Sequence, residues 1–499
     1  MSRSILSLIC SLYLAKPGAL ESTIGGSFKD VWEACEVNVK KKGLRMFLEE
    51  FVMTYAVFKW LMLAVLSGIL VGGAVSLFVK LLEFGIHVTG GLPAMAQKAL
   101  LPFGLVASAL MVHYLAPDAS GHGTEKVVEA VHERSGQIDV KVVPVKMITT
   151  IVTVAAGGSV GKEGPATQIA AGITSTLAGL LKLNDEDKKK LVICGVSAGF
   201  AAVFGTPVSG AIFALEVLFI GQIYYDVLFP SFISGVVAWR VANALGIVYS
   251  VYPVQENLPA FSVSTFLWTV LAGAFFGLVS LCFVEIITFC EKWFHHLKLP
   301  LAAKALLGAG LILATAFCVG DLYFGLGDGV VESLLHGGSV PPLAFFWKII
   351  ITSLTLSCGG SGGVVTPIFF MGAASGAAFA TFFGLNTVAY ASWGLAGVLA
   401  GCANAPIAST IMAIELFGAQ AAPFAAVVSV TSFMVVGHRS VYPSQLLSRS
   451  KSTLLEVREP GLRIDIDETS PVPGRSPVIH KVTDAIGRRW QSVRKKKRP

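Results

Sequence analysis

Residues 157–165 have the sequence Gly-Gly-Ser-Val-Gly-Lys-Glu-Gly-Pro, and residues 359–367 have the sequence Gly-Gly-Ser-Gly-Gly-Val-Val-Thr-Pro. Both segments keep the Gly-Gly-Ser start, a glycine at the fifth position and a proline at the ninth. A second pair of similar segments runs from a proline to a glutamate, at residues 207–216 and 406–415. The first pair is offset by 202 residues (359 − 157) and the second by 199 (406 − 207). Two homologous halves therefore follow one another along the chain.

The composition is typical of a membrane protein. Of the 499 residues, 54% are hydrophobic and 14% are charged, and the mean hydropathy is +0.71, whereas a soluble protein has about 25% charged residues. In an apolar chain, an internal duplication indicates a transport protein whose binding site lies where the two halves meet. The eight cysteines are scattered without zinc-type spacing, so we expect them to be small buried hydrophobic side chains.

A series of apolar segments is expected to form helices. A straight membrane span needs about 20 residues, but several segments are shorter and meet at joints such as Gly205-Thr206-Pro207 and Asn404-Ala405-Pro406. Interrupted backbone at membrane depth is tolerated only where it is buried in protein or lines a cavity, so these joints are candidate linings of an ion pathway. The apolar segments are residues 54–80, 98–116, 140–156, 165–183, 190–204, 207–221, 228–249, 263–289, 301–318, 343–358, 364–384, 389–402, 407–418 and 422–437.

Both ends of the chain differ in composition from its centre. Residues 1–50 are expected to form a cytoplasmic segment with an interfacial helix, because four positive residues between 40 and 45 precede the first long apolar run and positive flanks stay inside. A signal peptide within residues 1–20 is the alternative. Residues 446–499 are expected to be a disordered cytoplasmic tail. Seven of its last 12 residues are positive, which favours contact with anionic lipid headgroups over nucleic-acid binding.

The segment Gly161-Lys162-Glu163-Gly164-Pro165 precedes an apolar run, and its proline suits the first turn of a helix. A helix N-terminus has unpaired N–H groups and a positive dipole end, so it favours an anion. We expect the Glu163 carboxylate to occupy such an anion site and to leave it when protonated. A purely structural capping role is the alternative, but ionisable side chains inside a membrane are usually functional.

The sequence argues against enzymatic chemistry. A phosphate-binding loop would need Gly where Ala156 stands and Ser or Thr where Glu163 follows Lys162. The chain also has no HExxH zinc motif. We therefore expect no catalytic residues, no metal site, no cofactor and no enzymatic activity.

Taken together, these motifs resemble those of the CLC family of chloride channels and proton/chloride antiporters. The resemblance rests on GKEGP at 161–165, GGVVTP at 362–367, the two Pro-to-Glu helices and Tyr442. It extends over about residues 55–445. It implies an all-α polytopic membrane protein with two inverted-topology repeats of tilted and broken helices, here assigned to residues 51–250 and 251–445. It also implies a homodimer with one pathway per subunit.

The resemblance implies a role for each matching residue. Glu163 matches the gating glutamate that competes with chloride, and Lys146, 17 residues earlier, matches a buried lysine that contributes positive potential. Tyr442 matches the tyrosine whose hydroxyl binds the central anion, with an interfacial aromatic anchor as the alternative. The full set expected to bind chloride is Ser120, His122, Gly123, Gly161, Lys162, Gly363, Val364, Val365, Thr366 and Tyr442.

Three positions depart from the family pattern. Val364-Val365 replaces the usual Ile-Phe, a mild change. The segment Ser-Gly-His-Gly-Thr at 120–124 replaces the family's GSGIP motif. One alignment register puts His122 at the chloride-binding serine and another puts Ser120 there. An imidazole N–H can donate to an anion; the alternative is that His122 packs behind the site.

The third departure concerns protons. Antiporters of the family carry an internal proton-relaying glutamate directly after another glutamate. Here Glu216 matches the first of these, and Val217, which cannot bind a proton, stands in the relay position. Channel members typically have valine there, so the resemblance favours passive conduction. Relay by water or by Glu216 stays open.

The leading hypothesis is therefore a homodimeric, channel-like chloride conductor gated by Glu163, with chloride as the transported ion and protons as a further ion in the alternative. That alternative is a 2 Cl⁻/1 H⁺ antiporter without the usual internal glutamate. A fluoride exporter and a non-transport membrane scaffold or enzyme are weaker alternatives. We expect a multi-pass protein of the inner or plasma membrane with both termini in the cytoplasm. The tail after residue 445 is too short for the paired nucleotide-binding CBS domains of many relatives.

Overall fold

The structure, a computed structural model, describes residues 28–249, 252, 254–457, 463 and 469–471. Residues 1–27 and the basic chain end lie outside the described residues, so the predictions made for them stay predictions. The secondary-structure elements are α2 (Phe28–Gly90), α3 (Ala94–Leu115), η1 (Pro117–Ala119), α4 (Thr124–Glu133), α5 (Val142–Ala155), α6 (Glu163–Leu180), α7 (Asp185–Phe204), α8 (Pro207–Glu216), β1 (Phe219–Ile220), η2 (Tyr225–Val227), α9 (Leu228–Ala244), η3 (Gln255–Asn257), α10 (Val263–His296), α11 (Leu301–Val319), α12 (Asp328–Leu335), α13 (Ala344–Ser357), α14 (Val365–Phe383), α15 (Thr387–Ala403), α16 (Pro406–Phe417), η4 (Ala419–Ala421), α17 (Ala422–Val436), β2 (Leu446–Leu447), β3 (Leu455–Val457) and β4 (Thr469–Pro471).

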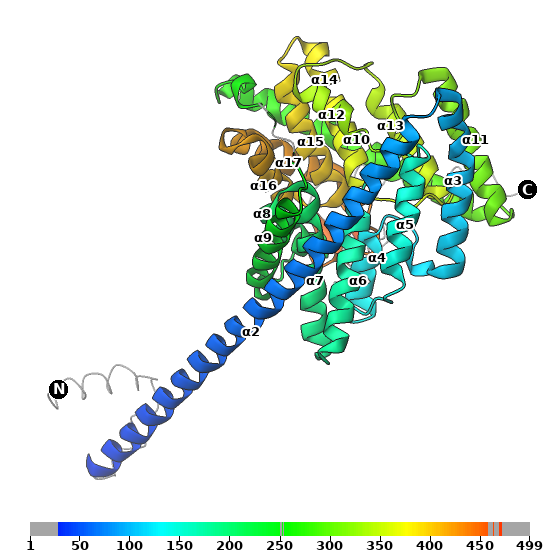
Figure 1. Cartoon of the computed structure of the whole chain (residues 1–499). Coiled ribbons are helices and arrows are strands. Elements are labelled where there is room, and N and C mark those ends of the chain that lie inside the picture. The colour runs from blue at the N-terminus through cyan, green and yellow to red at the C-terminus, as the bar shows by residue number, and fades with distance from the viewer. Residues whose placement is uncertain (1–27, 250–251, 253, 458–462, 464–468, 472–499) are drawn as a thin grey trace, which may run out of the picture. The chain divides into compact units, whose positions relative to one another are not determined.

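The chain divides into two compact units, residues 1–62 and 63–499. The described part of the first unit is helical throughout. Helix α2 continues without a break through residue 50, where the first segment was expected to end. The second unit contains the remaining helices, which differ in length and tilt (Figure 1).

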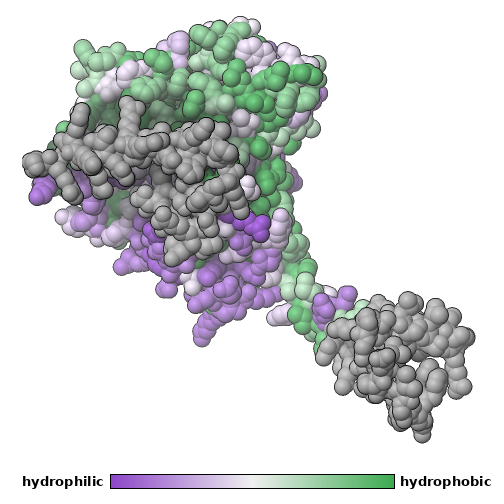
Figure 2. All heavy atoms as spheres, turned by 180° about the vertical axis from the view of Figure 1, so that it is seen from behind, coloured by the Kyte–Doolittle hydropathy of each residue, from purple (hydrophilic) through white to green (hydrophobic). Residues whose placement is uncertain are grey.

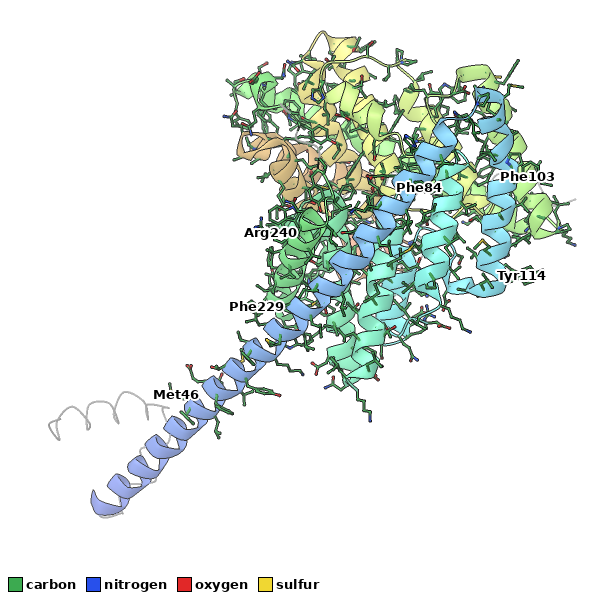
Figure 3. The ribbon with its side chains drawn as sticks, in the orientation of Figure 1. Met46, Phe84, Phe103, Tyr114, Phe229 and Arg240 are labelled. Atoms are coloured by element: carbon green, nitrogen blue, oxygen red, sulfur yellow. The ribbon has the colours of Figure 1, made fainter. Side chains whose placement is uncertain are left out.

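The second unit has the surface of a membrane protein. Seven helices of the described chain are long and apolar enough to cross a membrane, namely α2, α3, α9, α10, α11, α14 and α17. Figure 2 shows a broad hydrophobic region on one face, with hydrophilic residues gathered at its lower edge. The aromatic side chains of Phe84, Phe103 and Tyr114 point outward from α2 and α3 (Figure 3) and are 67%, 73% and 76% exposed. Such side chains suit contact with lipid or its interface.

Helix α14 is the most deeply buried of the seven long apolar helices. Of its most apolar stretch, 83% is buried inside the protein, against 50% or less for the other long apolar helices. It packs closely on α15 through small residues. A Cβ at Gly372 would lie 2.5 Å from the carbonyl oxygen of Gly394, and one at Gly376 would collide with the carbonyl oxygen of Tyr390. Because helices in lipid associate chiefly by close van der Waals contact, glycine at these positions allows the backbones to approach.

Reciprocal hydrogen bonds relate the two repeats. The Ser159 N–H donates to Thr355 Oγ1 at 3.3 Å, and the equivalent Ser361 N–H donates to Thr153 Oγ1 at 3.1 Å. Each partner is 202 residues from its counterpart (361 − 159 and 355 − 153). Such exchange of contacts is the signature of a two-fold axis. Both serines stand in a Gly-x-Ser-x-Gly sequence, but their hydroxyl groups are buried among threonines rather than presented as nucleophiles.

The broken helices are capped across the repeats. The Glu216 carboxylate at the end of α8 accepts from the N–H groups of Ile407 and Ala408, at 3.1 and 2.8 Å, in the first turn of α16. In return, the Glu415 carboxylate of α16 accepts from the N–H groups of Val208 and Ser209, at 2.9 and 2.8 Å, in α8. These bonds satisfy N–H groups that a helix start leaves unpaired. The predicted interruption of these helices is confirmed.

The chain after Tyr442 differs from the disordered tail that was expected from residue 446 onward. The structure describes residues 446–457 without a gap, and β2 pairs in parallel with β1 of the first repeat. The Gln445 side chain, which is buried, donates to the carbonyl oxygens of Val217 and Ala403 at 3.0 and 2.9 Å. Hydrophobicity did not indicate this order, because it depends on hydrogen bonds to distant backbone.

The glycine packing of α14 and α15 is testable by adding one methyl group. We expect Gly376→Ala to lower the thermal unfolding temperature and the yield of monodisperse protein in detergent, because overpacking costs about 1–3 kcal/mol. Gly310→Ala in α11 is the matched control, since a Cβ there meets nothing within 4 Å. Equal stability of the two variants, measured by thermal-shift assay and size-exclusion chromatography, would contradict the packing.

Candidate functional site

The two Gly-Gly-Ser segments meet directly. Gly161 and Gly363 form an antiparallel bridge in which each N–H donates to the other carbonyl oxygen at 2.7 Å. Only glycine permits this contact, because a Cβ at Gly363 would lie 2.6 Å from the Gly164 nitrogen. Helix α6 begins two residues after one glycine and α14 begins two residues after the other. The two helix N-termini therefore open at one point, and each brings the positive end of its dipole there.

The Glu163 side chain lies at this point. It is fully buried, and its Oε2 accepts from the Thr366 N–H at 3.1 Å. Its Oε1 accepts from the Thr366 hydroxyl. The carboxylate from the first repeat therefore caps the helix opened by the second. It occupies the Thr366 amide, one of those expected to hold an anion, while its role as a gate stays a prediction.

The residues on either side of the bridge form the rest of this surface. Val364 and Val365 are 1% exposed and Thr366 is 2% exposed, and their backbone forms the N-cap and first turn of α14. The first N–H groups of a helix have no intrahelical acceptor, so they are available to an anion. Lys162, on the opposite segment, donates to Asp328 at 3.0 Å.

Tyr442 reaches the same region from the C-terminal part of the chain. Its side chain is 1% exposed, and its hydroxyl hydrogen-bonds Thr124 at the start of α4. The Thr124 hydroxyl lies 2.9 Å from that of Thr167 in α6. Tyr442 is thus buried beside two helix starts, which does not match an interfacial anchor.

The His122 backbone, but not its ring, adjoins the helix α6 start. A Cβ at Gly164 would collide with the His122 carbonyl oxygen. The ring is 3% exposed and faces two carboxylates, with Nε2 3.2 Å from Glu291 Oε1 and Nδ1 3.5 Å from Glu125 Oε2. Gly123 is the N-cap of α4.

Ser120, the residue of the alternative register, lines a cavity of about 440 Å³. The structure thus brings both candidate residues near α4 but turns them toward different surroundings. Their roles as anion ligands stay predictions.

Two buried lysines flank the site. Lys146 of α5 donates to the carbonyl oxygens of Ala119 and Gly121 at 3.0 and 2.8 Å. Lys348 of α13, which sequence analysis missed, donates to those of Tyr323 and Gly325 at 3.1 and 3.0 Å. The offset of the two lysines, 202 residues (348 − 146), was the signal that could have revealed the second. Each amino group therefore lies among backbone carbonyl oxygens.

The positions expected to matter for protons contact α16 and Gln445. Val217 is 1% exposed, and its carbonyl oxygen accepts from Gln445. Glu216 is bound by the two α16 amides described above. Within the described ranges, no three His, Cys, Asp or Glu side chains are grouped as a metal site would require.

The Lys451 side chain attaches the segment that follows Tyr442 to α15 and α17. The Lys451 ammonium donates to Asn404 Oδ1 at 2.6 Å and to the Phe433 carbonyl oxygen at 2.7 Å, and it lies 3.5 Å from the centre of the Phe433 ring. Asn404 also ends α15 in a left-handed conformation, with φ of 54°. Burial lowers the pKa of Lys451 from 10.5 to about 7.

Comparison with known proteins identifies related chains. The family model described as voltage gated chloride channel matches residues 103–437. A chloride/fluoride channel protein of Pseudomonas syringae pv. tomato is 34% identical over 406 residues, which cover 79% of this chain and 87% of that protein.

Solved structures share the fold. The crystal structure of a CLC-type fluoride/proton antiporter matches with a TM-score of 0.74 and 25% identity, over 78% of this chain and 98% of that chain. The structure of a slow cyanobacterial Cl⁻/H⁺ antiporter matches with a TM-score of 0.67 and 19% identity, over 76% of this chain and 94% of that chain. The predicted fold class of inverted repeats with broken helices is confirmed.

The burial of Lys451 makes stability depend on pH. The unfolded chain keeps this proton up to about pH 10.5 and the folded protein only up to about pH 7, so between these values the unfolded state binds more protons and stability rises with pH. We expect Lys451→Met to remove this rise. Between about pH 7 and about pH 9.5, the thermal unfolding temperature should therefore increase less in the variant than in the wild type. Parallel profiles for the two proteins would show that the ammonium is not buried.

Proposed function

The chain belongs to the voltage gated chloride channel (CLC) family, and on that premise we propose that it conducts chloride passively across a membrane with the Glu163 carboxylate as its gate. The observation that carries the proposal is the position of this carboxylate on the Thr366 amide, at a helix N-terminus inside a multi-pass membrane protein. An amide site that accepts a carboxylate can accept a halide ion of the same charge.

The proposed gating follows from competition. While Glu163 is ionised, its carboxylate accepts from the Thr366 amide of α14 and excludes a second anion. When Glu163 is protonated it loses its charge, and chloride becomes the better partner for the positive end of the helix. The buried ammonium groups of Lys146 and Lys348 add positive potential that lowers the cost of an anion in the membrane interior.

The proposed chloride ligands surround the point where the repeats meet. The N–H groups of Val364, Val365 and Thr366 and the Tyr442 hydroxyl are the donors on one side. Lys162 completes the surface. Gly161 and Gly363, which were also expected to bind chloride, instead donate their N–H groups to each other's carbonyl oxygens and hold the two segments together. Gly123 at the start of α4, with Ser120 or His122, would contact the anion on its way to the cavity.

Passive conduction is favoured over proton coupling by Val217. Its side chain carries no titratable group, and the neighbouring Glu216 is bound to two amides of α16. The alternative is proton-coupled antiport, and fluoride is the alternative anion. Similarity to a protein named as a fluoride/proton antiporter supports both alternatives. The relative named as a chloride/fluoride channel protein also supports fluoride as the anion.

We also propose a homodimer with one pathway in each subunit, in the inner or plasma membrane, with both termini cytoplasmic. Exposed apolar side chains on α8, α9, α16 and α17 support an interface on these helices. Examples are Val208, Val236, Ile407 and Val430, which are 38%, 40%, 48% and 53% exposed. The basic chain end would lie on anionic lipid.

The proposal is tested by the reversal potential of the full chain reconstituted in lipid bilayers. Under a chloride gradient we expect reversal at the chloride equilibrium potential, unchanged when an opposing proton gradient is added, because no proton is coupled to the ion. A proton-dependent shift would instead establish antiport. Repeating the measurement with a fluoride gradient identifies the preferred anion.

Glu163→Gln tests the gate in the same bilayers. A neutral amide cannot titrate, so we expect anion flux that no longer depends on pH. Glu332→Gln, an exposed glutamate on α12, is the matched control and should keep the wild-type pH profile. An unchanged profile in Glu163→Gln would exclude this residue as the gate.

A further inference from the structure

A cavity leads from solvent toward the anion site beside α4. It has a volume of about 440 Å³ and lies among α3, α10, α11 and the loop that follows α13. Polar and titratable residues on its wall are His113, Ser120, Glu291, His295, Lys304, Ser357 and Ser361. Glu291 is 45% exposed, so its carboxylate can exchange protons with water.

At the inner side of this cavity, Glu291 contacts a buried imidazole. His122 Nε2 lies 3.2 Å from Glu291 Oε1. His122 Nδ1 faces Glu125 Oε2 at 3.5 Å and has no hydrogen-bond partner among the described atoms. Leaving a buried polar atom unpaired is unfavourable. A purely structural clamp between α10 and α4 would not need the second nitrogen.

Three further charged side chains, Lys146, Lys126 and Glu129, lie around His122 and Glu125. Lys146 of α5 acts electrostatically on His122, although its ammonium donates to the carbonyl oxygens of Ala119 and Gly121. Next to Glu125, Lys126 and Glu129 form their own ion pair at 2.9 Å.

The cluster adjoins the anion site through both backbone and side chains. The His122 carbonyl oxygen is in contact with Gly164, the residue after Glu163. Thr124, next to Glu125, hydrogen-bonds the Tyr442 hydroxyl. The carboxylates of Glu125 and Glu163 are both close enough to that hydroxyl to act on it electrostatically.

We propose that Glu291, His122 and Glu125 form a relay that carries protons from the cavity to Glu163. It rests on the proposed gating by Glu163 and adds the route by which the gate is protonated from one side of the membrane. Imidazole suits this task because its two nitrogens can take up and release a proton near neutral pH.

The steps conserve protons. Water in the cavity protonates the Glu291 carboxylate, and the new O–H donates to the free Nε2 of His122. The Nδ1–H bond then breaks as its proton passes to Glu125, which leaves neutral imidazole with hydrogen on Nε2. The ring then turns about its Cβ–Cγ bond, which brings the Nε2–H to the side of Glu125 and the free Nδ1 to the side of Glu291, so that the next proton can enter at Nδ1 and leave from Nε2. From Glu125 the proton passes the hydroxyl groups of Thr124 and Tyr442 to Glu163.

The test uses excised membrane patches, in which all copies of the full chain have one orientation, and pH is changed on each side separately. A gate opened by one proton responds by up to about tenfold per pH unit. We expect His122→Gln, whose amide can still bind Glu291, to lose this response on one side only. Glu291→Gln should have the same effect. Glu285→Gln, also on α10 but paired with Arg439, is the control and should respond like the wild type.

The outcomes separate the relay from the gate itself. The relay would be overturned if the anion current of His122→Gln and Glu291→Gln still responded fully to pH on both sides. It would also be overturned if the wild type responded to pH on one side only and both variants kept that response. Loss of all anion current in His122→Gln with a normal pH response in Glu291→Gln would assign His122 to anion binding and overturn the relay. Failure of the proposed function is distinct, since it appears as absence of wild-type anion current or as unchanged pH responses in Glu163→Gln.

Discussion

The antiparallel contact of Gly161 with Gly363 is the constraint on which the rest of the structure depends. Two hydrogen bonds of 2.7 Å hold the repeated segments together where no side chain fits. Helices α6 and α14 start from this contact, so their unpaired N–H groups face one place in the interior of a membrane protein. Unpaired donors are costly in a medium of low dielectric constant. Glu163 supplies the negative group that they require.

The buried glutamates differ in what they bind, and this difference indicates which of them have a structural role and which is proposed to be the gate. Glu216 and Glu415 each bind two N–H groups that belong to fixed helix starts. Their removal would leave those groups unsatisfied, so both acids are held in place. Glu163 also binds a helix start, where we propose that an ion from solution can replace it. This difference in replaceability, rather than burial alone, is the physical reason for assigning the gate to Glu163.

Much of the fold could be predicted from the sequence, because long apolar runs and Pro- or Gly-marked joints are local signals. The short helices α4 and α12 were missed, since neither forms an apolar run of its own. The orientation of the His122 ring toward Glu291 could not be predicted, because the two residues are 169 positions apart in the chain and no local pattern indicates their contact. The cross-capping of α8 and α16 was equally hidden, although Glu216 and Glu415 stand at the same spacing from their prolines, which indicated two equivalent acids. The order of the segment after Tyr442 depends on Gln445 and β1, which are also distant in sequence.

The central claim is that an anion and the Glu163 carboxylate exclude each other at the start of α14. Crystals grown in bromide test it directly, because anomalous scattering locates this ion. We predict no bromide at the Thr366 amide in the wild type at a pH where Glu163 is ionised, and a bromide peak at that amide in Glu163→Gln. Bromide bound to the Thr366 amide in the wild type with the carboxylate still in place, or no bromide there in the variant, would contradict the account.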